Sequence, residues 1–596
     1  MSTRATRSPR RRTVVALGVV LAILIAFVVR LVDIQVVNAD EHVADSVKMS
    51  LGASRTLYGT RGAIVDEAGV VLAGSILLYD AQLDPSNVGP VERKAADGTE
   101  VEVPWEETSA EIAAVTGQTP EEVQKIVADA KAQNPSSQWA LLTRGLSTEK
   151  FRTLADLELP FLSFTPHPAR TYPDGAVGGN LVGFVGRDGE ALAGLELTQD
   201  DCLTTKDGHE SYSVGKDGVV IPGTLLTEPA TDGGTLQLTI NRDLQWYLQQ
   251  MIAEEVQNQV AQRGTAFVVE VATGKVRAAA EYPTVDPNDI DASKPEDRGS
   301  RLFTTVFEPG STFKAVTAAT LLEEGAADPL TTVTASSSES FPNGARINDA
   351  FTHPAFTYTL AGALIDSSNV ALSKFGGMVS PQVRHDYLAR FGVGQPTDIG
   401  FLGEEPGVLH PVSEWDNQTI YTTTFGQAFT VTVPQVASAY QTIANGGIRM
   451  PLTLVEGCTK SDGTVVKPDL PEPERIVSEA TADTTALMIE NVSVQGGLSK
   501  VIAVPGYRIA TKTGTAQKVD PVNGGYKSGV YYTSMVGFAP ADNPEYVVMV
   551  TLDEPTKVTS SAATAPAFQK AMTQVLKTYR VMPSSTAEPE LLPKFK

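Results

Sequence analysis

Residues 266–280 read AFVVEVATGKVRAAA, and this stretch carries the strongest fold signal in the sequence. Two apolar runs of strand length, 266–271 and 275–280, flank the turn Ala272-Thr273-Gly274. This pattern is typical of a β-hairpin. We therefore predict a hairpin of central strands in a sheet.

The segments around this hairpin extend the pattern. Residues 236–240 alternate like a strand, and Asp243 is expected to cap a helix whose apolar side chains between 244 and 256 share one face. Near the other end of the sequence we expect two more strands and a helix, at 531–537, 546–552 and 567–579. The intervening stretch 313–444 is mostly helical by periodicity. A sheet flanked by helices, with an all-helical part beside it, is an α+β sandwich, and this is the predicted fold class.

Residues 40–230 are uneven by comparison. Strand-like stretches at 62–65 and 70–73 alternate with glycine and aspartate, and two short helices are expected within 108–131. This part of the chain is therefore predicted to be a mixed, partly extended module.

The first residues predict a membrane anchor. Five arginines precede an uncharged run from Thr13 to Val29, and apolar residues resume beyond Arg30 and Asp33 up to Val37. The run reaches spanning length if Arg30 snorkels toward the far interface. The five arginines favour the cytoplasmic side, so residues after 37 are placed outside the cell. These arginines are Arg4, Arg7, Arg10, Arg11 and Arg12. A cleaved signal peptide is the alternative, disfavoured by the long apolar core and by the absence of a small-residue cleavage site.

Composition excludes several classes of function. The 596 residues include 70 acidic and 47 basic side chains, a formal net charge of −23, which disfavours nucleic-acid binding. Two cysteines, Cys202 and Cys458, exclude a cysteine-rich metal cluster; outside the cell they permit a disulfide but do not demand one. Six histidines lack the spacing of a zinc site. We therefore expect no metal and a chemistry of hydroxyls, amines and carboxylates.

A candidate nucleophile lies in residues 307–314, FEPGSTFK. Ser311 stands where a loop opens an apolar helix, and Lys314 follows three residues later. This spacing places both side chains on one helical face, where the amine can take the hydroxyl proton. The helix start also directs backbone N–H groups toward the reacting oxygen. Ser311 and Lys314 are thus candidate catalytic residues.

Two other Ser-x-x-Lys strings show that this pattern is weak by itself. Ser147 to Lys150 is typical of a surface helix cap, and Ser213 to Lys216 lies in a predicted turn region. Ser311 differs from both because two further motifs follow it.

The second motif is Ser367-Ser368-Asn369, on a loop that leads into a helix. Ser367 offers a second hydroxyl for proton transfer, and Asn369 offers an amide that can hold a substrate carbonyl or the lysine. Taken alone, the motif is more typical of an Asp or Ser helix cap.

The third motif is Lys512-Thr513-Gly514-Thr515 on a predicted strand. A peptide lying along this strand could present a carboxylate to Lys512 and to the hydroxyls of Thr513 and Thr515. Gly514 has no side chain to block such a ligand. The similar string Lys527-Ser528-Gly529 fits a hairpin loop better.

These motifs in this order resemble the signature of the class B penicillin-binding proteins, single-pass D,D-transpeptidases that cross-link peptidoglycan. The resemblance covers nearly the whole chain past the anchor, and the further matching segments are Arg61 to Asp66 with Gly69 and Leu72-Ala73, Arg170 to Pro173, Gly194 to Glu196, Gly426-Gln427 and Ala444 to Gly447. The sequence departs from the family pattern at three places, which are Glu67 instead of Arg, Ala428 instead of Gly, and Val433-Pro434 instead of Thr-Pro.

The resemblance implies a division of the chain into five parts. They are a cytoplasmic tail (1–12), a transmembrane anchor (13–37), a pedestal or dimerisation-type domain (38–230), a transpeptidase domain (231–582) and a short tail (583–596) that we expect to be frayed.

The resemblance also implies roles for the motif residues. Ser311 would attack a D-Ala-D-Ala stem peptide, and Lys314 would accept its proton if burial and Lys512 keep that lysine neutral. Ser367 would relay the proton to the departing D-alanine, and Asn369 would orient the donor peptide. Lys512, Thr513, Gly514 and Thr515 would bind its carboxylate end, with backbone N–H groups of Ser311 and Thr515 as the oxyanion hole.

The implied partners are peptidoglycan stem peptides, β-lactam antibiotics, a membrane glycan polymerase and other divisome or elongasome proteins. No metal or organic cofactor is required.

Two other functions stay open. A β-lactamase or D,D-carboxypeptidase would resolve the acyl-enzyme with water, and a membrane scaffold or β-lactam sensor would do no chemistry. The anchor and pedestal disfavour the first, and the intact Ser311, Lys314 and Lys512 disfavour the second. A bifunctional class A enzyme is disfavoured because the space before residue 230 is too small for a glycosyltransferase domain.

Overall fold

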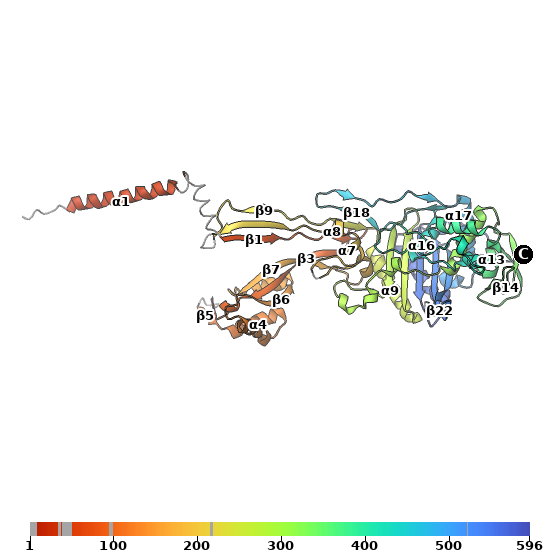
Figure 1. Ribbon diagram of the computed structural model, residues 1–596, viewed down its shortest axis with the longest axis horizontal. Helices are drawn as coiled ribbons and strands as arrows, with labels where there is room; N and C mark the ends of the chain where they lie inside the picture. Colours follow the sequence, from red (N-terminus) through yellow and green to blue (C-terminus); the bar gives the residue numbers. More distant parts are fainter. Residues whose placement is uncertain are drawn as a thin grey trace, which may run out of the picture. The chain divides into compact units, whose positions relative to one another are not determined.

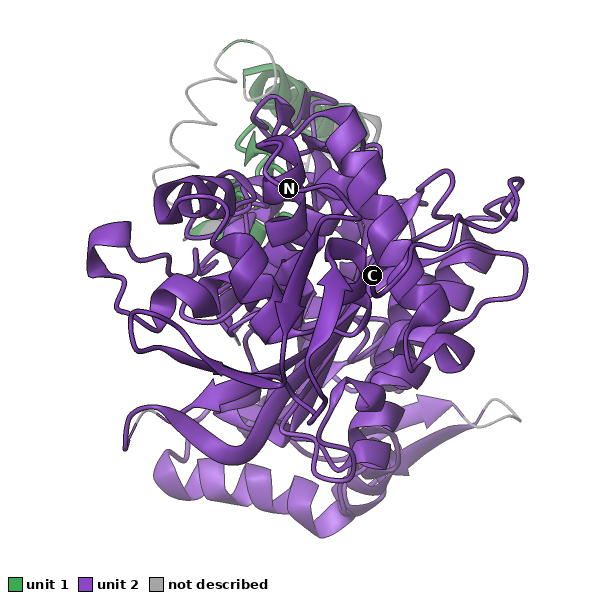
Figure 2. Ribbon diagram, turned by 90° about the vertical axis from the view of Figure 1, so that its right-hand side faces the viewer, with its two compact units in different colours: residues 1–60, 205–232 green, residues 61–204, 233–596 purple. Residues whose placement is uncertain are grey.

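The structure is a computed structural model that describes residues 9–33, 37, 51–94, 99–186, 188–214, 219–520 and 522–596. The chain divides into two compact units, Met1–Thr60 with Thr205–Asp232 and Arg61–Thr204 with Gly233–Lys596 (Figure 2). Three predictions fall partly outside the described residues: Arg4 and Arg7 of the basic tail, positions 34–36 of the anchor, and Lys216 of one Ser-x-x-Lys string.

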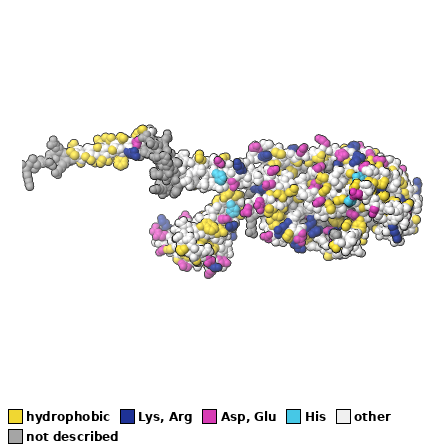
Figure 3. Space-filling model, in the orientation of Figure 1, with side chains coloured by type: hydrophobic (Ala, Val, Ile, Leu, Met, Phe, Trp, Pro, Cys, Tyr) yellow, Lys and Arg dark blue, Asp and Glu magenta, His cyan; other side chains and the backbone are white. Residues whose placement is uncertain are grey.

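The first unit begins with helix α1 (Pro9–Val32), whose surface is apolar along most of its length (Figure 3). Its segment Thr13–Val32, 20 residues, is long and apolar enough to cross a membrane, and no part of it is buried by protein. Arg30 pairs with Asp33 at 2.6 Å, so the two charges that interrupt the apolar run lie together near the helix end. A helix that is apolar on all sides requires lipid or protein around it, which agrees with the predicted anchor.

A three-stranded antiparallel sheet completes the first unit. Strand β8 (Gly208–Val214) lies between β1 (Leu51–Leu57) and β9 (Leu226–Glu228). Ser213, which the sequence places in a turn region, is instead part of β8.

The second unit opens with a small lobe (Figure 1). Its strands are β3 (Val71–Leu83), β6 (Ala140–Leu146) and β7 (Leu162–Thr171), with the hairpin β4 (Val91–Lys94) and β5 (Glu100–Val103), and its helices are α3 (Trp105–Thr116), α4 (Pro120–Gln133) and α5 (Thr148–Ala155). Side chains such as Ile112 and Phe161 form a core of their own. The two helices expected within 108–131 are confirmed, and a capping box at Thr119 begins the second. Ser147 caps α5, as predicted.

A run of paired strands connects this lobe to the rest of the unit. Strand β2 (Ile64–Val65) pairs with β3 and with β10 (Thr235–Leu238), and β10 pairs with β18 (Val455–Thr459), which pairs with β19 (Val465–Val466). Three short helices precede β10 in the sequence, α6 (Gly179–Val182), α7 (Gly194–Thr198) and α8 (Asp200–Leu203).

Cys202 of α8 and Cys458 of β18 form a disulfide with their Cα atoms 6.0 Å apart. Strand β10 brings them together, because Gly234 donates a backbone hydrogen bond to the Cys202 carbonyl and Leu236 pairs with Cys458. The sequence alone leaves this bond open, since the pairing depends on contacts between segments far apart in the chain.

The centre of the second unit is a five-stranded antiparallel sheet in the order β12-β11-β23-β22-β21. The strands are β11 (Arg263–Glu270), β12 (Val276–Tyr282), β21 (Ala510–Val519), β22 (Tyr526–Ala539) and β23 (Tyr546–Asp553). The predicted hairpin and the two later strands are confirmed. The prediction that both hairpin strands are central is wrong for β12, which is an edge strand; helix α9 (Arg242–Gln259) packs beside it and explains its apolar composition.

Alternate side chains of β11 belong to two separate cores. Ala266 and Val268 pack with α9 and α19 (Ala565–Thr578), whereas Phe267 and Val269 pack with the helical part of the unit. This layered arrangement confirms the α+β class.

The cap of α9 differs from the prediction. Asn241, not Asp243, caps the helix, because its Oδ1 accepts a hydrogen bond from the Leu244 N–H at 2.9 Å. Asp243 lies in the first turn of the helix, where a negative charge is favourable.

The helical part carries the remaining helices, which are α10 (Arg301–Thr304), α11 (Lys314–Glu323), α12 (Leu360–Ile365), α13 (Asn369–Gly376), α14 (Pro381–Arg390), α15 (Thr419–Thr422), α16 (Val433–Ala444), α17 (Glu479–Gln495) and α18 (Ser499–Ile502). It also holds three two-stranded antiparallel sheets, β13 (Thr332–Ala335) with β16 (Phe356–Thr359), β14 (Ser338–Ser340) with β15 (Arg346–Asn348), and β17 (Ile448–Arg449) with β20 (Glu474–Arg475). The prediction of an all-helical stretch is therefore wrong between residues 332 and 359, where threonine, serine and aromatic residues form strands.

The expectation of a frayed tail at 583–596 is also wrong. Ser584 donates a backbone hydrogen bond to Gly506, Leu592 is 8% exposed, and Phe595 pairs with Tyr358 of β16. The buried side chain of Leu592 and hydrogen bonds such as that of Ser584 explain why this segment packs.

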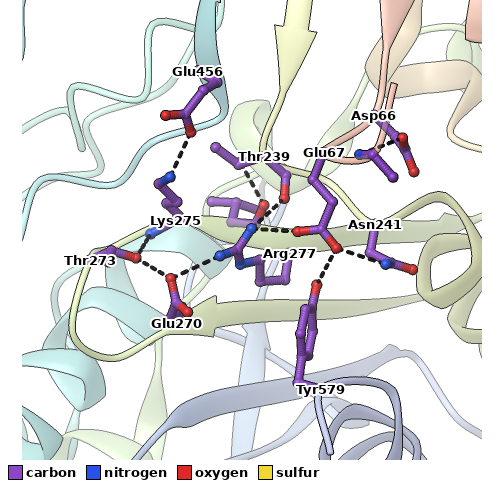
Figure 4. A network of polar contacts seen from close by, with 12 residues as sticks. Asp66, Glu67, Thr239, Asn241, Glu270, Thr273, Lys275, Arg277, Glu456 and Tyr579 are labelled. Atoms are coloured by element: carbon purple, nitrogen blue, oxygen red, sulfur yellow. Dashed lines mark hydrogen bonds and ion pairs between the residues drawn. The ribbon is translucent and has the colours of Figure 1, made fainter. Parts of the chain in front are cut away.

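Glu67, a departure from the family pattern, lies at the centre of a polar network (Figure 4). Its carboxylate accepts hydrogen bonds from Arg277 at 2.5 Å, Asn241 at 2.7 Å and Tyr579 at 3.3 Å. Arg277 also donates to Glu270 at 3.0 Å. Burial, and then the charge of Glu67, raise the pKa of Tyr579, which keeps its hydroxyl proton. The network thus ties the β2–β3 turn to the start of α9, strand β12 and the end of α19.

We expect Glu67→Arg to lower the unfolding midpoint of the protein, because it places a second cation beside Arg277 and removes the acceptor of Asn241 and Tyr579. The loss in free energy of unfolding should be about 2–4 kcal/mol. Thermal unfolding of the purified chain measures it, with Glu67→Gln as a control that keeps one acceptor and should lose less. An unchanged midpoint for Glu67→Arg would contradict a stabilising role of the network.

Candidate active site

The three sequence motifs meet at one edge of the five-stranded sheet. Ser311 lies in a 3-10 turn, η5 (Gly310–Phe313), and Lys314 is the first residue of the following helix α11. Ser367 lies in the turn between α12 and α13, and Lys512 lies on the edge strand β21. Strand β21 packs against η5. Three segments that are distant in the sequence thus lie close together in the fold.

Two lysines converge on the hydroxyl of Ser367. The Lys314 amine donates to Ser367 Oγ at 3.1 Å and to the Ser367 carbonyl at 2.5 Å, and the Lys512 amine donates to the same Oγ at 3.0 Å. A serine hydroxyl has two lone pairs, so it accepts both bonds and keeps its own proton for a third partner.

Both lysine side chains are fully buried. Burial, and then the charge of Lys512, hold the pKa of Lys314 well below its usual value, while Asp349 acts in the opposite direction. Burial lowers the pKa of Lys512 to about 7. No carboxylate of the described chain forms an ion pair with either amine. Burial and the charge of Lys512 therefore both favour the uncharged form of Lys314.

Ser367 has a left-handed backbone, with φ of +57°. This conformation is unfavourable for residues other than glycine and persists where the surroundings fix it. Its N–H donates to the Leu364 carbonyl at 3.2 Å, and the next residue, Ser368, caps α13 by accepting from the Ala371 N–H at 3.0 Å. The turn thus presents the carbonyl and the hydroxyl of Ser367 to Lys314 together.

Asp349, which the sequence analysis missed, supports this turn. Its carboxylate accepts hydrogen bonds from Ser368 Oγ at 2.7 Å and from the Val370 N–H at 2.9 Å, and lies 2.8 Å from Nε2 of His353. Burial lowers the pKa of His353, but its hydrogen bonds outweigh this effect and leave the pKa raised. Strand β16 and helix α12 separate Asp349 from the turn in the sequence, so no short-range pattern reveals it.

The hydroxyl of Ser311 is half-buried and has no hydrogen-bond partner within the described part of the chain. Within the described chain the Lys314 amine donates to the Ser367 carbonyl and forms no hydrogen bond with Ser311. The Ser311 hydroxyl is therefore available to an incoming group.

Gly514 is predicted from the sequence to leave room for a ligand, but in the structure it leaves room for neighbouring protein atoms. A Cβ atom at this position would lie 2.4 Å from Ser534 Oγ and 3.0 Å from Thr312 Cγ2. The space beside the glycine is therefore filled by protein, and the missing side chain lets β21 approach η5. Thr515 next to it is exposed, and its hydroxyl accepts a hydrogen bond from the Ser561 N–H at 3.0 Å.

The other predicted site residues lie on the same elements. Thr513 is half-buried on β21, next to Lys512. Asn369 begins α13, and its amide donates to the Asn348 carbonyl at 2.9 Å. Lys314, Ser367 and Lys512 are thus joined by hydrogen bonds, while the remaining predicted residues lie on η5, α13 and β21 without a side-chain hydrogen bond to that group in the described chain.

Glu308, three residues before Ser311, fixes the turn that carries the serine. Its carboxylate accepts hydrogen bonds from the Tyr526 hydroxyl at 2.9 Å and from the Ala428 N–H at 2.9 Å. Burial raises the pKa of Glu308. Close by, a Cβ on Gly426 would lie 2.0 Å from the Gly310 carbonyl, so this loop packs directly on η5. The departure at Ala428 keeps the contact, because only its backbone N–H is used.

Two family models match the chain. The penicillin binding protein transpeptidase domain matches residues 264–573, and the penicillin-binding protein dimerisation domain matches residues 56–238. The first range contains all three motifs and the five-stranded sheet.

Curated relatives match over nearly the full length. Penicillin-binding protein PbpB of Mycolicibacterium smegmatis is 32% identical, over 96% of this chain and 91% of that protein. Peptidoglycan D,D-transpeptidase FtsI of Escherichia coli is 30% identical, over 95% of this chain and 92% of that protein.

Solved structures show the same fold. A peptidoglycan synthetase from Bifidobacterium adolescentis aligns with a TM-score of 0.71 and 27% identity, over 92% of this chain and 100% of that one. Penicillin binding protein 3 from Mycobacterium tuberculosis, complexed with aztreonam, aligns with a TM-score of 0.68 and 27% identity, over 91% of this chain and 100% of that one.

We expect Gly514→Ala to destabilise the protein by about 1–3 kcal/mol, because the added methyl group would clash with Ser534 of β22 and press on Thr312 of η5. The double variant Gly514→Ala with Ser534→Ala should recover part of the loss, since it removes the hydroxyl oxygen nearest to the new methyl. Thermal unfolding of the two variants and of Ser534→Ala alone measures this. Full stability of Gly514→Ala would contradict the packing role.

Proposed function

The chain belongs to the class B penicillin-binding proteins, and from this premise we propose that it is a peptidoglycan D,D-transpeptidase whose nucleophile is Ser311. The observation that carries the proposal is the convergence of two buried lysines, Lys314 and Lys512, on Ser367 beside the turn of Ser311. A neutral amine next to a serine hydroxyl is the requirement for serine acyl transfer without histidine.

In the first step, Ser311 Oγ attacks the carbonyl between the two D-alanines of a stem peptide. An ester forms at Ser311, the D-Ala-D-Ala amide bond breaks, and the proton of Ser311 passes to neutral Lys314. The negative oxygen of the intermediate would be held by the backbone N–H groups of Ser311 and Thr515, a contribution typically of about 3 kcal/mol per donor.

The departing D-alanine needs a proton on its nitrogen. Ser367 accepts from both lysine amines and keeps its own hydroxyl proton, so it can hand that proton to the leaving amine and take another from Lys314. Lys512, Thr513 and Thr515 would bind the terminal carboxylate, and Asn369 would orient the peptide. Gly514 contributes through the close packing of β21 on η5.

In the second step, an amine of a neighbouring stem peptide attacks the ester of Ser311. An amide cross-link forms and the serine hydroxyl is restored. A β-lactam enters the same first step, but its ring amide opens without releasing a group, so the acyl-enzyme persists and the protein is inhibited.

We further propose how the chain is arranged in the cell. Helix α1 anchors it in the cell membrane with the N-terminal arginines on the cytoplasmic side and the catalytic domain, residues 231–582, outside. Residues 38–230 form the pedestal. A membrane glycan polymerase and other divisome or elongasome proteins are the proposed partners, because a cross-linking enzyme needs newly made glycan strands.

We expect Ser311→Ala to abolish covalent labelling by a fluorescent penicillin, because Ser311 is the proposed nucleophile and the other hydroxyl beside the buried amines, that of Ser367, is hydrogen-bonded to both of them. Ser147→Ala is the matched control, since Ser147 begins another Ser-x-x-Lys string but caps α5, and it should label fully. With donor and acceptor stem peptides, mass spectrometry should detect a cross-linked dimer from the parent chain. Labelling that survives in Ser311→Ala would reject the nucleophile, and hydrolysed donor alone would indicate a carboxypeptidase.

The rate of penicillin acylation should rise with pH and level off well below the usual lysine pKa of 10.5, because only the uncharged lysine accepts the serine proton. Protonation at low pH removes the base, so the rate falls as pH decreases through the titration of the lysine pair, whose Lys512 member has a pKa of about 7. Stopped-flow acylation between pH 5 and about pH 11 tests this. A rate that continues to rise up to pH 10.5 would show an ordinary exposed lysine.

A further inference from the structure

Residues 592–595, which the sequence analysis expected to be frayed, cross the first turn of α12. The Thr359 N–H donates to the Lys594 carbonyl at 3.0 Å, and the Thr359 hydroxyl donates to the Pro593 carbonyl at 2.6 Å. The Lys594 carbonyl lies so close to α12 that a Cβ on Gly362 would be 1.9 Å from it. The 592–595 segment therefore fixes the start of the helix that ends at the Ser367 turn.

The same segment also reaches the other end of α12. The amine of Lys594 pairs with Asp366 Oδ1 at 2.7 Å, and Asp366 is the residue directly before Ser367. Their side chains are 27% and 19% exposed, so the pair is partly shielded from water. One short segment thus contacts both ends of a helix of six residues, α12 (Leu360–Ile365).

The 592–595 segment is itself fixed to the element behind Lys512. The Leu592 N–H donates to Asn491 Oδ1 at 2.9 Å, and Gln495 donates to the Leu592 carbonyl at 2.9 Å. Both partners are on α17, which packs against strand β21. The segment therefore bridges the helix behind the Lys512 strand and the helix that carries the Ser367 turn.

A second route leads from the segment to the same turn. The ring of Phe595 lies 4.7 Å from that of Phe356, measured between centroids, and the Phe356 ring stacks on His353 at 5.2 Å. His353 contacts Asp349, which accepts the hydrogen bond of Ser368. Phe595 thus supports the far side of the turn through packed rings and one carboxylate.

We propose that the 592–595 segment is a positioning element of the active site, and that Lys594 acts through Asp366 to fix the Ser367 turn. The need for such an element follows from Ser367 itself, whose left-handed backbone requires outside support and whose hydroxyl must meet two amines at once. This inference rests on the proposed function, because it concerns the rate at which the site becomes acylated.

The test is stopped-flow acylation of the full chain by a fluorescent penicillin, with the rate constant and the fraction labelled recorded separately. Lys594→Met should lower the rate constant about tenfold, because a displaced proton-transfer group slows the reaction sharply. The fraction labelled should stay complete, since a folded site still reacts. Lys594→Arg keeps the cation and should react within about twofold of the parent.

Two further variants sharpen the test. Asp366→Asn should slow acylation as Lys594→Met does, and the double variant should be no slower than either single one, because both break the same contact. Lys596→Met is the matched control. Lys596 is two residues away and exposed, its side chain has no partner in the described chain, and the variant should react at the parent rate.

Distinct outcomes overturn distinct claims. A parent chain that no penicillin labels would reject the proposed function itself. A labelled parent with an unchanged rate constant in Lys594→Met would reject the positioning role alone. A reduced labelled fraction at an unchanged rate constant would also reject it, because that result means that the segment only keeps the protein folded.

Discussion

The site depends on the burial of two lysine side chains around one hydroxyl. Removing an ammonium group from water costs several kcal/mol, and two such groups bound to the same oxygen repel each other as well. The lowered pKa values of Lys314 and Lys512 follow directly. The same burial that disfavours the charged form creates the uncharged amine that acyl transfer needs.

The rest of the fold keeps these two amines buried and aligned. Because Gly514 has no side chain, β21 packs closely on Thr312 of η5, and the loop at Gly426 packs directly on Gly310 for the same reason. The left-handed turn at Ser367 directs two oxygen atoms toward Lys314, and Asp349 fixes the residues after it. Farther away, the disulfide and the Glu67 network join segments that are distant in the sequence.

The sequence predicts the parts of this arrangement that depend on local pattern. The hairpin around Gly274, the helices within 108–131 and the apolar anchor all have a periodicity or a turn signal that decides them. The three motifs are recognisable because Ser311, Ser367 and Lys512 each stand at the start of an element or on a strand, where a reactive side chain can be presented.

What the sequence could not predict depends on contacts between distant segments. Asn241 and Asp243 both have side chains that can cap α9. The hydrogen bond that the Leu244 N–H donates to Asn241 decides between them. Asp349 and Lys594 contact residues of the Ser367 turn, but neither lies at a regular sequence spacing from Ser367. The Lys314 amine hydrogen-bonds to Ser367 and not to Ser311, because the α12–α13 turn presents a carbonyl to it. The spacing of residues within η5 and α11 does not predict that carbonyl.

The most direct test of the account is the titration of the two buried amines. In the chain labelled with ¹³C at lysine Cε, NMR resonances assigned with Lys314→Arg and Lys512→Arg variants would report both groups. We predict that Lys512 titrates near pH 7 and that Lys314 is largely uncharged at neutral pH. Two resonances that stay in the charged form up to the usual lysine pKa of 10.5 would contradict the account.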